Sequence, residues 1–272
     1  MRTILKTFLI LCMGMIWMHT AFAQMEEINI VGSTTVLPIA QITAEEYMNK
    51  NPQVSISVGG GGSSIGAKAL LAGTTDIADC SRPLKDKELR AAAEKGIAPK
   101  PHIVAMDGIA VIVHKSNMLA NISIEDLKAI YTGDISDWSE VGGPSGKIVV
   151  ISRDTSSGTY EAFNNLALKK AKVRSDALLQ ASNKAVLTTV IQTPSAIGYV
   201  GMGYVTAEVN AVSVNGVKPT KETVLSKEYP ISRPLYMYTN GDPKGQVKDY
   251  LDFVKSKEGQ VLAEEQGFVG LY

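Results

Sequence analysis

A strand, a short turn rich in Gly, Ser and Thr, and a helix follow one another three times along this chain of 272 residues. Apolar alternation or an apolar run predicts each strand, and apolar residues at helical spacing follow each turn. Chains that alternate strands and helices fold as α/β proteins with a largely parallel sheet, and their ligands bind beyond the carboxyl ends of the strands. The three turns comprise residues 32–35, 62–64 and 157–159.

The turn at 157–159 indicates an anion most clearly. It opens a helix predicted over 160–170, where the first N–H groups are unpaired and the helix dipole is positive. Arg153 precedes it and adds a permanent charge with a planar fork of donors. Alone, each turn would be an ordinary helix cap. Together, and with the Ser81-Arg82 pair, the three turns predict a site for an oxyanion.

The remaining pattern predicts two α/β lobes. The chain crosses to a second lobe after a break at Asp107-Gly108 and returns through the strand at 233–238. Lobe 1 is therefore expected to comprise 24–113 and 232–272, and lobe 2 to comprise 114–231. We expect further strands at 76–78, 102–106, 109–113 and 196–200. Asn51-Pro52 should stop the first helix, and a helix that begins after Ser123 should end at Gly133. Further helices are expected at 86–94, 185–191, 247–254 and 260–266.

Residues 1–23 have the pattern of an export signal. A basic start is followed by an apolar core and by the small-x-small sequence Ala21-Phe22-Ala23. We expect cleavage before Gln24 and a soluble periplasmic protein, with lipid attachment at Cys12 as the less favoured alternative. Cys80 is then the only cysteine, so no intramolecular disulfide forms.

Charge and composition argue against several function classes. The predicted signal holds two of the 27 basic residues and none of the 27 acidic ones, so the rest has a small negative charge that does not favour nucleic acid. His102 and His114 lack metal-ligand spacing, so neither a metal nor another cofactor is expected. The nucleotide-binding pattern Gly-x-x-x-x-Gly-Lys-Ser/Thr does not occur. A serine hydrolase would need a base beside Ser63 or Ser157, and few histidines are available.

These motifs, in this order, resemble the phosphate-binding proteins of ABC-type phosphate importers. The resemblance covers nearly all of the chain after the signal. It implies a periplasmic-binding-protein-like type II fold, with two α/β lobes, a two-segment hinge and inorganic phosphate in the cleft between them. The motifs that carry it are Gly32-Ser33-Thr34-Thr35, Gly61-Gly62-Ser63-Ser64-Ile65-Gly66, Asp76-Ile77, Ser81-Arg82, residues 153–159, Ala196-Ile197-Gly198-Tyr199-Val200 and Arg233-Pro234-Leu235-Tyr236.

The resemblance also implies a set of phosphate-binding residues. Arg153 would supply the charge that pairs with phosphate. Ser81 stands where some members carry an Asp that accepts a phosphate proton, so another acceptor is needed to reject sulfate. Asp107 is the candidate, with Asp79 and Asp154 as alternatives, and Arg82 is a further candidate contact. The remaining implied donors are Thr34, Thr35, Ser63, Ser157, Gly158 and Thr159.

The expected function is phosphate binding and delivery to the permease subunits of an ABC importer. The protein would be a monomer that touches the membrane complex only peripherally, and it would not be an enzyme. A receptor for sulfate or molybdate is one alternative, and a phosphatase-like enzyme is another.

Overall fold

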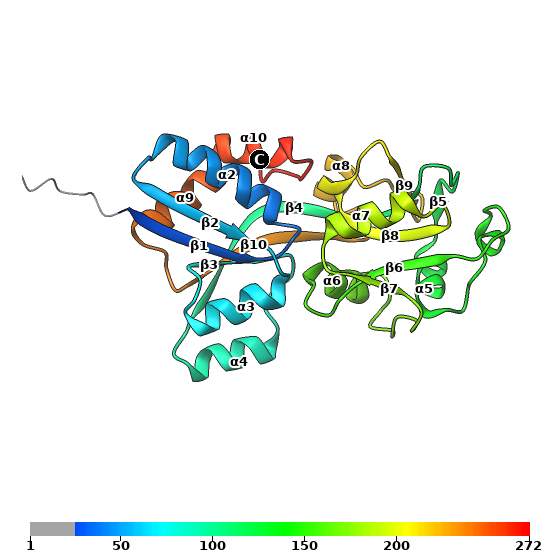
Figure 1. Ribbon diagram of the computed structural model, residues 1–272, viewed down its shortest axis with the longest axis horizontal. Coiled ribbons are helices and arrows are strands. Elements are labelled where there is room, and N and C mark those ends of the chain that lie inside the picture. The colour runs from blue at the N-terminus through cyan, green and yellow to red at the C-terminus, as the bar shows by residue number, and fades with distance from the viewer. Residues whose placement is uncertain (1–24) are drawn as a thin grey trace, which may run out of the picture.

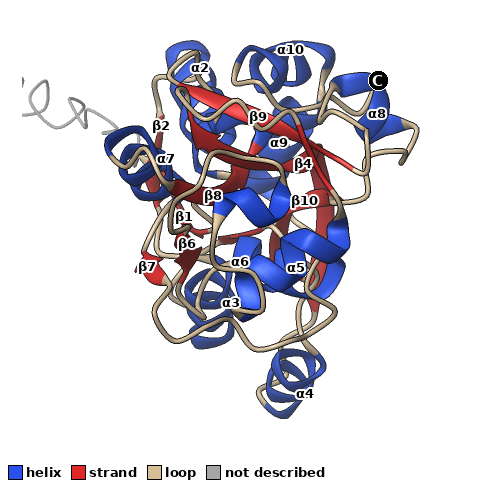
Figure 2. Ribbon diagram, turned by 90° about the vertical axis from the view of Figure 1, so that its right-hand side faces the viewer, coloured by secondary structure: helices blue, strands red, loops and turns tan. Residues whose placement is uncertain are grey.

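The computed structural model describes residues 25–272, and the predicted signal at 1–23 lies outside them. Two lobes lie side by side along the long axis of the molecule (Figure 1). One ten-stranded sheet passes through both, in the order β2-β1-β3-β10-β4-β8-β6-β7, with β9 paired to β4 and β5. Strands lie between helices on both sides, as the view from the end of lobe 2 shows (Figure 2).

Lobe 1 begins with the strand, turn and helix units predicted from the sequence. Strands β1, β2 and β3 pair in parallel, with β1 in the middle. Helix α3 packs on one face of this sheet through Ala67 and Leu70, and α2 packs on the other through Ile39 and Ala40. The elements are β1 (Glu26–Gly32), α2 (Leu37–Lys50), β2 (Val54–Gly59), α3 (Ser63–Ala72), β3 (Ile77–Cys80) and α4 (Asp86–Glu94).

Two antiparallel strands, β4 (Pro99–His114) and β10 (Ser232–Asn240), connect the lobes. The first part of β4 pairs with β10, and from Ile109 onward it pairs with β8 and β9 in lobe 2. The break expected at Asp107-Gly108 is absent, because both residues keep their pairing with β10 and the strand runs on. The partners of β4 change just after this dipeptide, which is where the chain passes from one lobe to the other.

Lobe 2 is a second α/β unit. Its parallel strands β6, β7 and β8 are covered by α7 on one face, through Val186 and Val190, and by α5 and α6 on the other, where the Phe163 and Tyr199 rings stack. The elements are β5 (Asn121–Ile122), α5 (Ile124–Thr132), η1 (Trp138–Val141), β6 (Val149–Arg153), α6 (Gly158–Leu166), β7 (Leu178–Gln180), α7 (Asn183–Gln192), β8 (Ala196–Gly201), η2 (Met202–Tyr204), β9 (Val209–Val214) and α8 (Lys221–Leu225).

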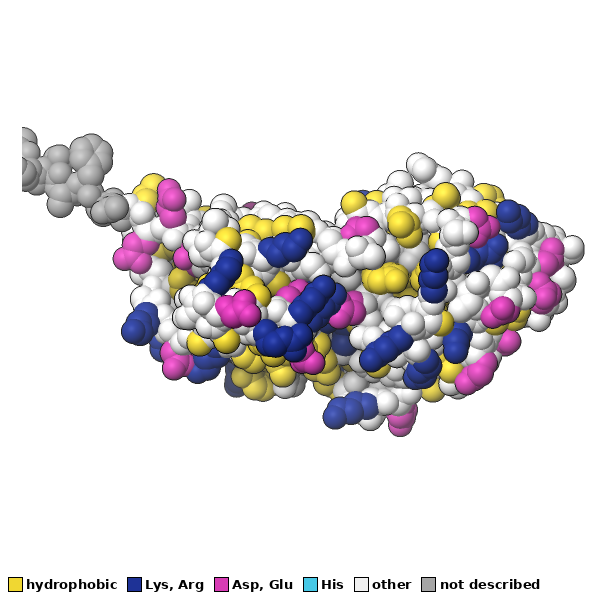
Figure 3. Space-filling model, turned by 90° about the horizontal axis from the view of Figure 1, so that it is seen from below, with side chains coloured by type: hydrophobic (Ala, Val, Ile, Leu, Met, Phe, Trp, Pro, Cys, Tyr) yellow, Lys and Arg dark blue, Asp and Glu magenta, His cyan; other side chains and the backbone are white. Residues whose placement is uncertain are grey.

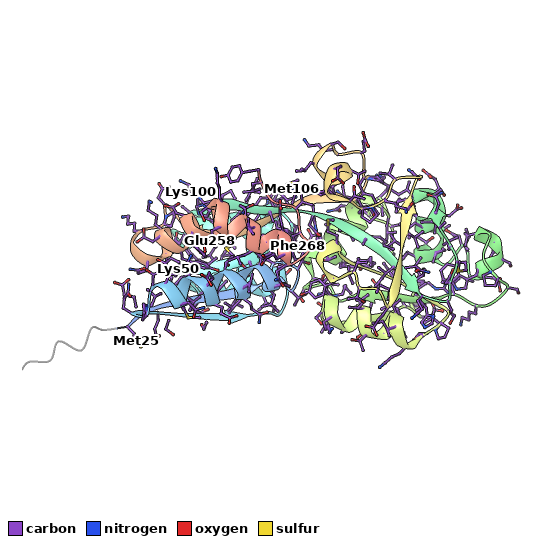
Figure 4. The ribbon with its side chains drawn as sticks, turned by 90° about the horizontal axis from the view of Figure 1, so that it is seen from above. Met25, Lys50, Lys100, Met106, Glu258 and Phe268 are labelled. Atoms are coloured by element: carbon purple, nitrogen blue, oxygen red, sulfur yellow. The ribbon has the colours of Figure 1, made fainter. Side chains whose placement is uncertain are left out.

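The C-terminal segment returns to lobe 1 as α9 (Gly245–Lys255) and α10 (Lys257–Glu265). Helix α10 lies beside α2, where Lys50 and Glu258 form an ion pair (Figure 4). The end of the chain then reaches the junction between the lobes, where Met106 N donates to Val269 O at 2.8 Å and Phe268 is buried. No helix within residues 25–272 is both long and apolar enough to cross a bilayer.

Two further differences from the sequence predictions are local. Helix α6 begins at Gly158 and ends at Leu166, so the expected span of 160–170 is wrong at both ends. Lys169 and Lys170 have positive φ angles, which a continuing helix cannot contain. The strands β5, β7 and β9 and the short helix α8 were not predicted, because two- to six-residue elements give little periodicity.

Candidate anion-binding site

The three turns meet where the two lobes are in contact. Strand β1 delivers the turn before α2, and the start of α3 lies beside the end of β3. From lobe 2, the end of β6 and the start of α6 face them. Direct hydrogen bonds join the two sides: Ser64 N donates to Ser156 O at 3.0 Å, and Ser156 Oγ donates to Gly61 O at 3.1 Å. The predicted convergence of the turns is therefore present in the structure.

Arg153 is a buried cation without an acidic partner. It is 1% exposed, and it forms no ion pair with any carboxylate among residues 25–272. Its Nε and Nη2 donate to Gln180 O and Ala181 O, both at 3.0 Å, whereas the buried Nη1 has no hydrogen-bond partner. Burial, together with the nearby Arg233 guanidinium, lowers the pKa of Arg153 from its usual value. A charge held in this way needs an anion to compensate it.

Two threonine hydroxyls link the lobes beside a second buried arginine. Thr35 Oγ1 and Thr159 Oγ1 lie 2.7 Å apart, one from each lobe. Arg233 Nη2 donates to Thr159 Oγ1 at 3.0 Å and also forms an ion pair with Asp107 Oδ2 at 2.8 Å. Arg233 therefore has its counter-ion within the protein, and Arg153 does not. The centre of the cleft consequently carries one uncompensated positive charge.

Small residues bring the two lobes close together at a third point. Ser63 Oγ and Ser81 Oγ lie 3.4 Å apart, and Ser81 N donates to Ser63 Oγ at 3.0 Å. A Cβ on Gly158 would lie 2.2 Å from Ser63 Oγ and 2.6 Å from Ser81 Oγ, so only glycine fits there. Ser157 Oγ accepts from Tyr160 N at 3.1 Å, which makes it the cap of α6. Its hydroxyl thus has a structural role in addition to any contact with a ligand.

Thr34 of lobe 1 contacts three residues of lobe 2, and two of them, Asn183 and Tyr204, were not predicted from the sequence. Thr34 Oγ1 accepts from Arg153 Nη2 at 3.3 Å and from Asn183 Nδ2 at 3.2 Å. Asn183 is fully buried at the start of α7, and its amide also donates to Thr35 Oγ1 at 3.0 Å. Tyr204 OH donates to Thr34 O. Neither Asn183 nor Tyr204 belongs to a sequence motif. The one signal for Asn183 is its place as a polar residue directly after the Ser182 cap, at the start of another helix.

Arg82 does not point into this cluster. Its Nη1 donates to Pro83 O and to Glu88 Oε2, and its Nη2 donates to Ser64 Oγ and to Glu88 Oε1. The remaining nitrogen, Nε, lies 2.9 Å from Glu161 Oε2. Its Nη1 and Nη2 thus bond other protein atoms, whereas Nε is close to Glu161 as an ion pair but forms no hydrogen bond. The geometry offers no support for the predicted phosphate contact of Arg82.

The three candidate carboxylates differ in their surroundings. Asp107 is fully buried, and burial raises its pKa while the Arg233 guanidinium opposes that rise. Its Oδ1 accepts from Met202 N at 3.0 Å. Asp79 is also fully buried, has no hydrogen-bond partner, and has a pKa raised by burial. Asp154 instead orders its own loop by accepting from Ser156 N at 2.7 Å. Of the three, Asp107 is the one bonded to Arg233 of β10, which also donates to Thr159.

The hydrolase alternative has one sequence feature in its favour. Residues 62–66 follow the Gly-x-Ser-x-Gly pattern around Ser64, although only Ser63 and Ser157 were considered as nucleophiles from the sequence. Ser64 Oγ accepts from Arg82 at 3.0 Å, however, and neither histidine reaches it: His102 pairs with Thr239 and His114 with Ser116. A serine without a base is a poor nucleophile. Among residues 25–272 no group of three or more His, Cys, Asp or Glu side chains could hold a metal ion.

Comparison with known proteins places this geometry in a family. Residues 20–258 match the model described as the PBP superfamily domain. The phosphate-binding protein PstS of Borreliella burgdorferi is 36% identical over 256 residues, which is 90% of each chain. PstS of Bacillus subtilis is 34% identical over 89% of this chain and 80% of its own.

The chain belongs to the phosphate-binding proteins of the PBP superfamily.

Solved structures of this family agree with the fold. A substrate-binding protein of Clostridium perfringens, crystallised with bound phosphate, has a TM-score of 0.85 at 34% identity, covering 91% of this chain and all of its own. An ABC-type phosphate transport receptor of Vibrio cholerae has a TM-score of 0.74 at 32% identity, over 89% of this chain and 99% of its own. The type II α/β fold expected from the sequence is therefore confirmed.

Proposed function

We propose that this protein binds inorganic phosphate between its two lobes and delivers it to an ABC-type importer. The observation that carries the proposal is Arg153, a buried guanidinium whose Nη1 has no hydrogen-bond partner and which forms no ion pair with a carboxylate among residues 25–272. Binding is preferred to chemistry because charge-assisted hydrogen bonds of about 1.5–3 kcal/mol each reach the roughly 8 kcal/mol of a micromolar complex with only a few contacts. The names of the relatives, which include a phosphate transport receptor, support the same reading.

The proposed ligand set follows the cleft. Arg153 supplies charge, and the hydroxyls of Thr34, Thr35 and Thr159 rotate from their mutual hydrogen bonds toward the anion. Hydroxyl groups suit this exchange because each can donate or accept. The further proposed contacts are Ser63, Ser81, Ser157 and the backbone of Gly158, together with Arg233, which the sequence reasoning did not place in the site.

Asp107 is the proposed acceptor for the phosphate proton. Its Oδ2 accepts from Arg233, which also donates to Thr159, so this carboxylate directly adjoins the proposed ligand set. Phosphate near neutral pH retains an O–H donor, whereas sulfate has none and would meet the carboxylate with repulsion alone. This role would favour phosphate over sulfate and molybdate.

Delivery requires the lobes to open and close. We propose that β4 and β10 act as the hinge, with lobe 1 formed by 24–113 and 232–272 and lobe 2 by 114–231. The protein is proposed to be exported to the periplasm as a monomer after loss of residues 1–23, and to contact permease subunits without entering the membrane. No catalytic step is assigned to it.

An anion panel tests this function. Melting temperatures measured with phosphate, sulfate, molybdate and chloride should rise with phosphate, because a ligand that binds only the folded state stabilises it. A larger rise with sulfate or molybdate would favour the alternative receptor. Turnover of a phosphomonoester, lost on Ser64→Ala, would favour the enzyme.

A further inference from the structure

A cluster of charged side chains spans the two lobes outside the anion site. Arg82 and Lys85 precede α4 in lobe 1, and Glu161 lies in the first turn of α6 in lobe 2. Glu161 Oε2 lies 2.9 Å from Arg82 Nε and 2.5 Å from Lys85 Nζ. Basic and acidic side chains adjoin where the lobes meet on the lower face (Figure 3). These contacts join elements of different lobes, so they exist only when the lobes are together.

The lobe 1 side of this cluster is held in place by its own lobe. Glu88 binds the Arg82 fork through both carboxylate oxygens, each at 2.8 Å, and Arg82 is 3% exposed. Ser64 and Pro83 occupy two of its other N–H groups. Arg82 therefore keeps its orientation whether or not lobe 2 is close, and only its Nε side is left to meet Glu161.

The lobe 2 side is tied to the anion site. Glu161 follows Thr159 by two residues on the same helix turn, and Arg82 follows Ser81 directly. Gly158, at the start of the same helix, lies against Ser81. Movement that brings these two residues together thus also brings Glu161 to Arg82 and Lys85. Because the Arg82 charge is already balanced by Glu88, Lys85 is the cation that balances Glu161.

From these contacts we infer that Glu161 helps to retain the bound ligand by holding the two lobes together. It latches lobe 2 onto Arg82 and Lys85 and slows the opening of the closed cleft. The inference rests on the proposed function for its ligand, but the latch itself consists of contacts between the lobes. Removal of the Glu161 charge should therefore weaken retention of the anion. Simple electrostatics predicts the opposite, because removing a negative charge beside an anion site should tighten anion binding.

The test compares phosphate dissociation by stopped flow in the wild type, Glu161→Gln, Lys85→Gln and the double variant. Glu161→Gln should raise the dissociation rate constant by about tenfold, and Lys85→Gln should have a much smaller effect in the Glu161→Gln background than in the wild type. Glu125→Gln is the matched control, since Glu125 occupies the first turn of α5 in lobe 2 and is exposed. It should leave the rate constant unchanged. An unchanged or slower dissociation from Glu161→Gln would overturn the inference.

A second measurement separates failure of the latch from failure of the proposed function. If the wild type binds no phosphate, the function is wrong, and the latch is then measured without ligand. Spin labels on Glu94→Cys and Lys172→Cys, exposed positions in lobe 1 and lobe 2, report the distance between the lobes. Glu161→Gln should shift this distribution to longer distances. An unchanged distance distribution would show that Glu161 does not hold the lobes together.

Discussion

Replacing Arg153 with methionine should abolish tight phosphate binding while leaving the protein folded. The buried Nη1 has no hydrogen-bond partner in the part of the chain that the structure describes. Its two N–H groups can therefore bind an anion, at about 1.5–3 kcal/mol for each charge-assisted bond. Their loss, about 3–6 kcal/mol, weakens binding at least about 100-fold. Folding changes less, because the bonds lost to Gln180 O, Ala181 O and Thr34 Oγ1 are offset by the removed cost of burying a cation.

The assay pairs calorimetric phosphate titration with urea unfolding. Arg174→Met is the matched control, since Arg174 lies in the same lobe and already forms an ion pair with Asp176. The control should bind phosphate as the wild type does. The free energy of unfolding of Arg153→Met should lie within about 2 kcal/mol of the wild-type value. Wild-type phosphate affinity in Arg153→Met would refute the assignment of Arg153 as the charge that holds the ligand.

Three further variants test separate parts of the account. Gly158→Ala places a Cβ 2.2 Å from Ser63 Oγ in the opposite lobe, so calorimetry should show phosphate affinity reduced by about tenfold or more while the melting temperature changes little. Asp107→Asn leaves Arg233 buried without its counter-ion and should lower the free energy of unfolding by about 3–5 kcal/mol, while competition titration should show sulfate gaining on phosphate. Burial raises the pKa of Asp79, so the folded state retains a proton that the unfolded chain releases, and stability falls as pH rises above the unfolded pKa of about 4. Asp79→Asn should therefore increase the free energy of unfolding, with a gain that grows by up to about 1.4 kcal/mol per pH unit between pH 5 and 7 in urea titrations.

Each of these variants has an outcome that contradicts its reasoning. Wild-type affinity in Gly158→Ala would mean that the lobes do not need to approach so closely. Unchanged discrimination between phosphate and sulfate in Asp107→Asn would show that Asp107 does not accept the phosphate proton. A gain for Asp79→Asn that is the same at both pH values would mean that Asp79 is ionised in the folded protein.

The strand, turn and helix units could be predicted because they are local. Helix α4 was predicted over the residues at which it is found, and α2 and α5 end where Asn51-Pro52 and Gly133 suggested. Glycine and proline determine which backbone angles are allowed at their own positions, so the helix ends that they mark can be predicted without knowing the tertiary structure. The end of α6 could not be predicted in this way, because Leu166 and the residues that follow it, Ala167-Leu168-Lys169-Lys170, are all residue types that favour a helix.

Partners of the site residues were harder to predict. The sequence indicated Thr35 and Thr159 as donors, but not that their hydroxyls meet, since the two residues are 124 positions apart in the chain. Arg233 was part of a recognised motif, yet its pairing with Asp107 depends on the register of β10 against β4, which periodicity does not determine. Asn183 carries no motif at all. The surroundings of Arg82 were hidden for a related reason: nothing in Ser81-Arg82 shows that this side chain lies against Glu88 and Glu161.

Phosphate titration of the purified wild-type protein, with and without excess sulfate, tests the central claim most directly. The account predicts one phosphate per chain, bound with micromolar or tighter affinity that a large excess of sulfate barely weakens. No measurable heat with phosphate, or competition by sulfate at equal concentration, would contradict the assignment of this cleft as a phosphate site.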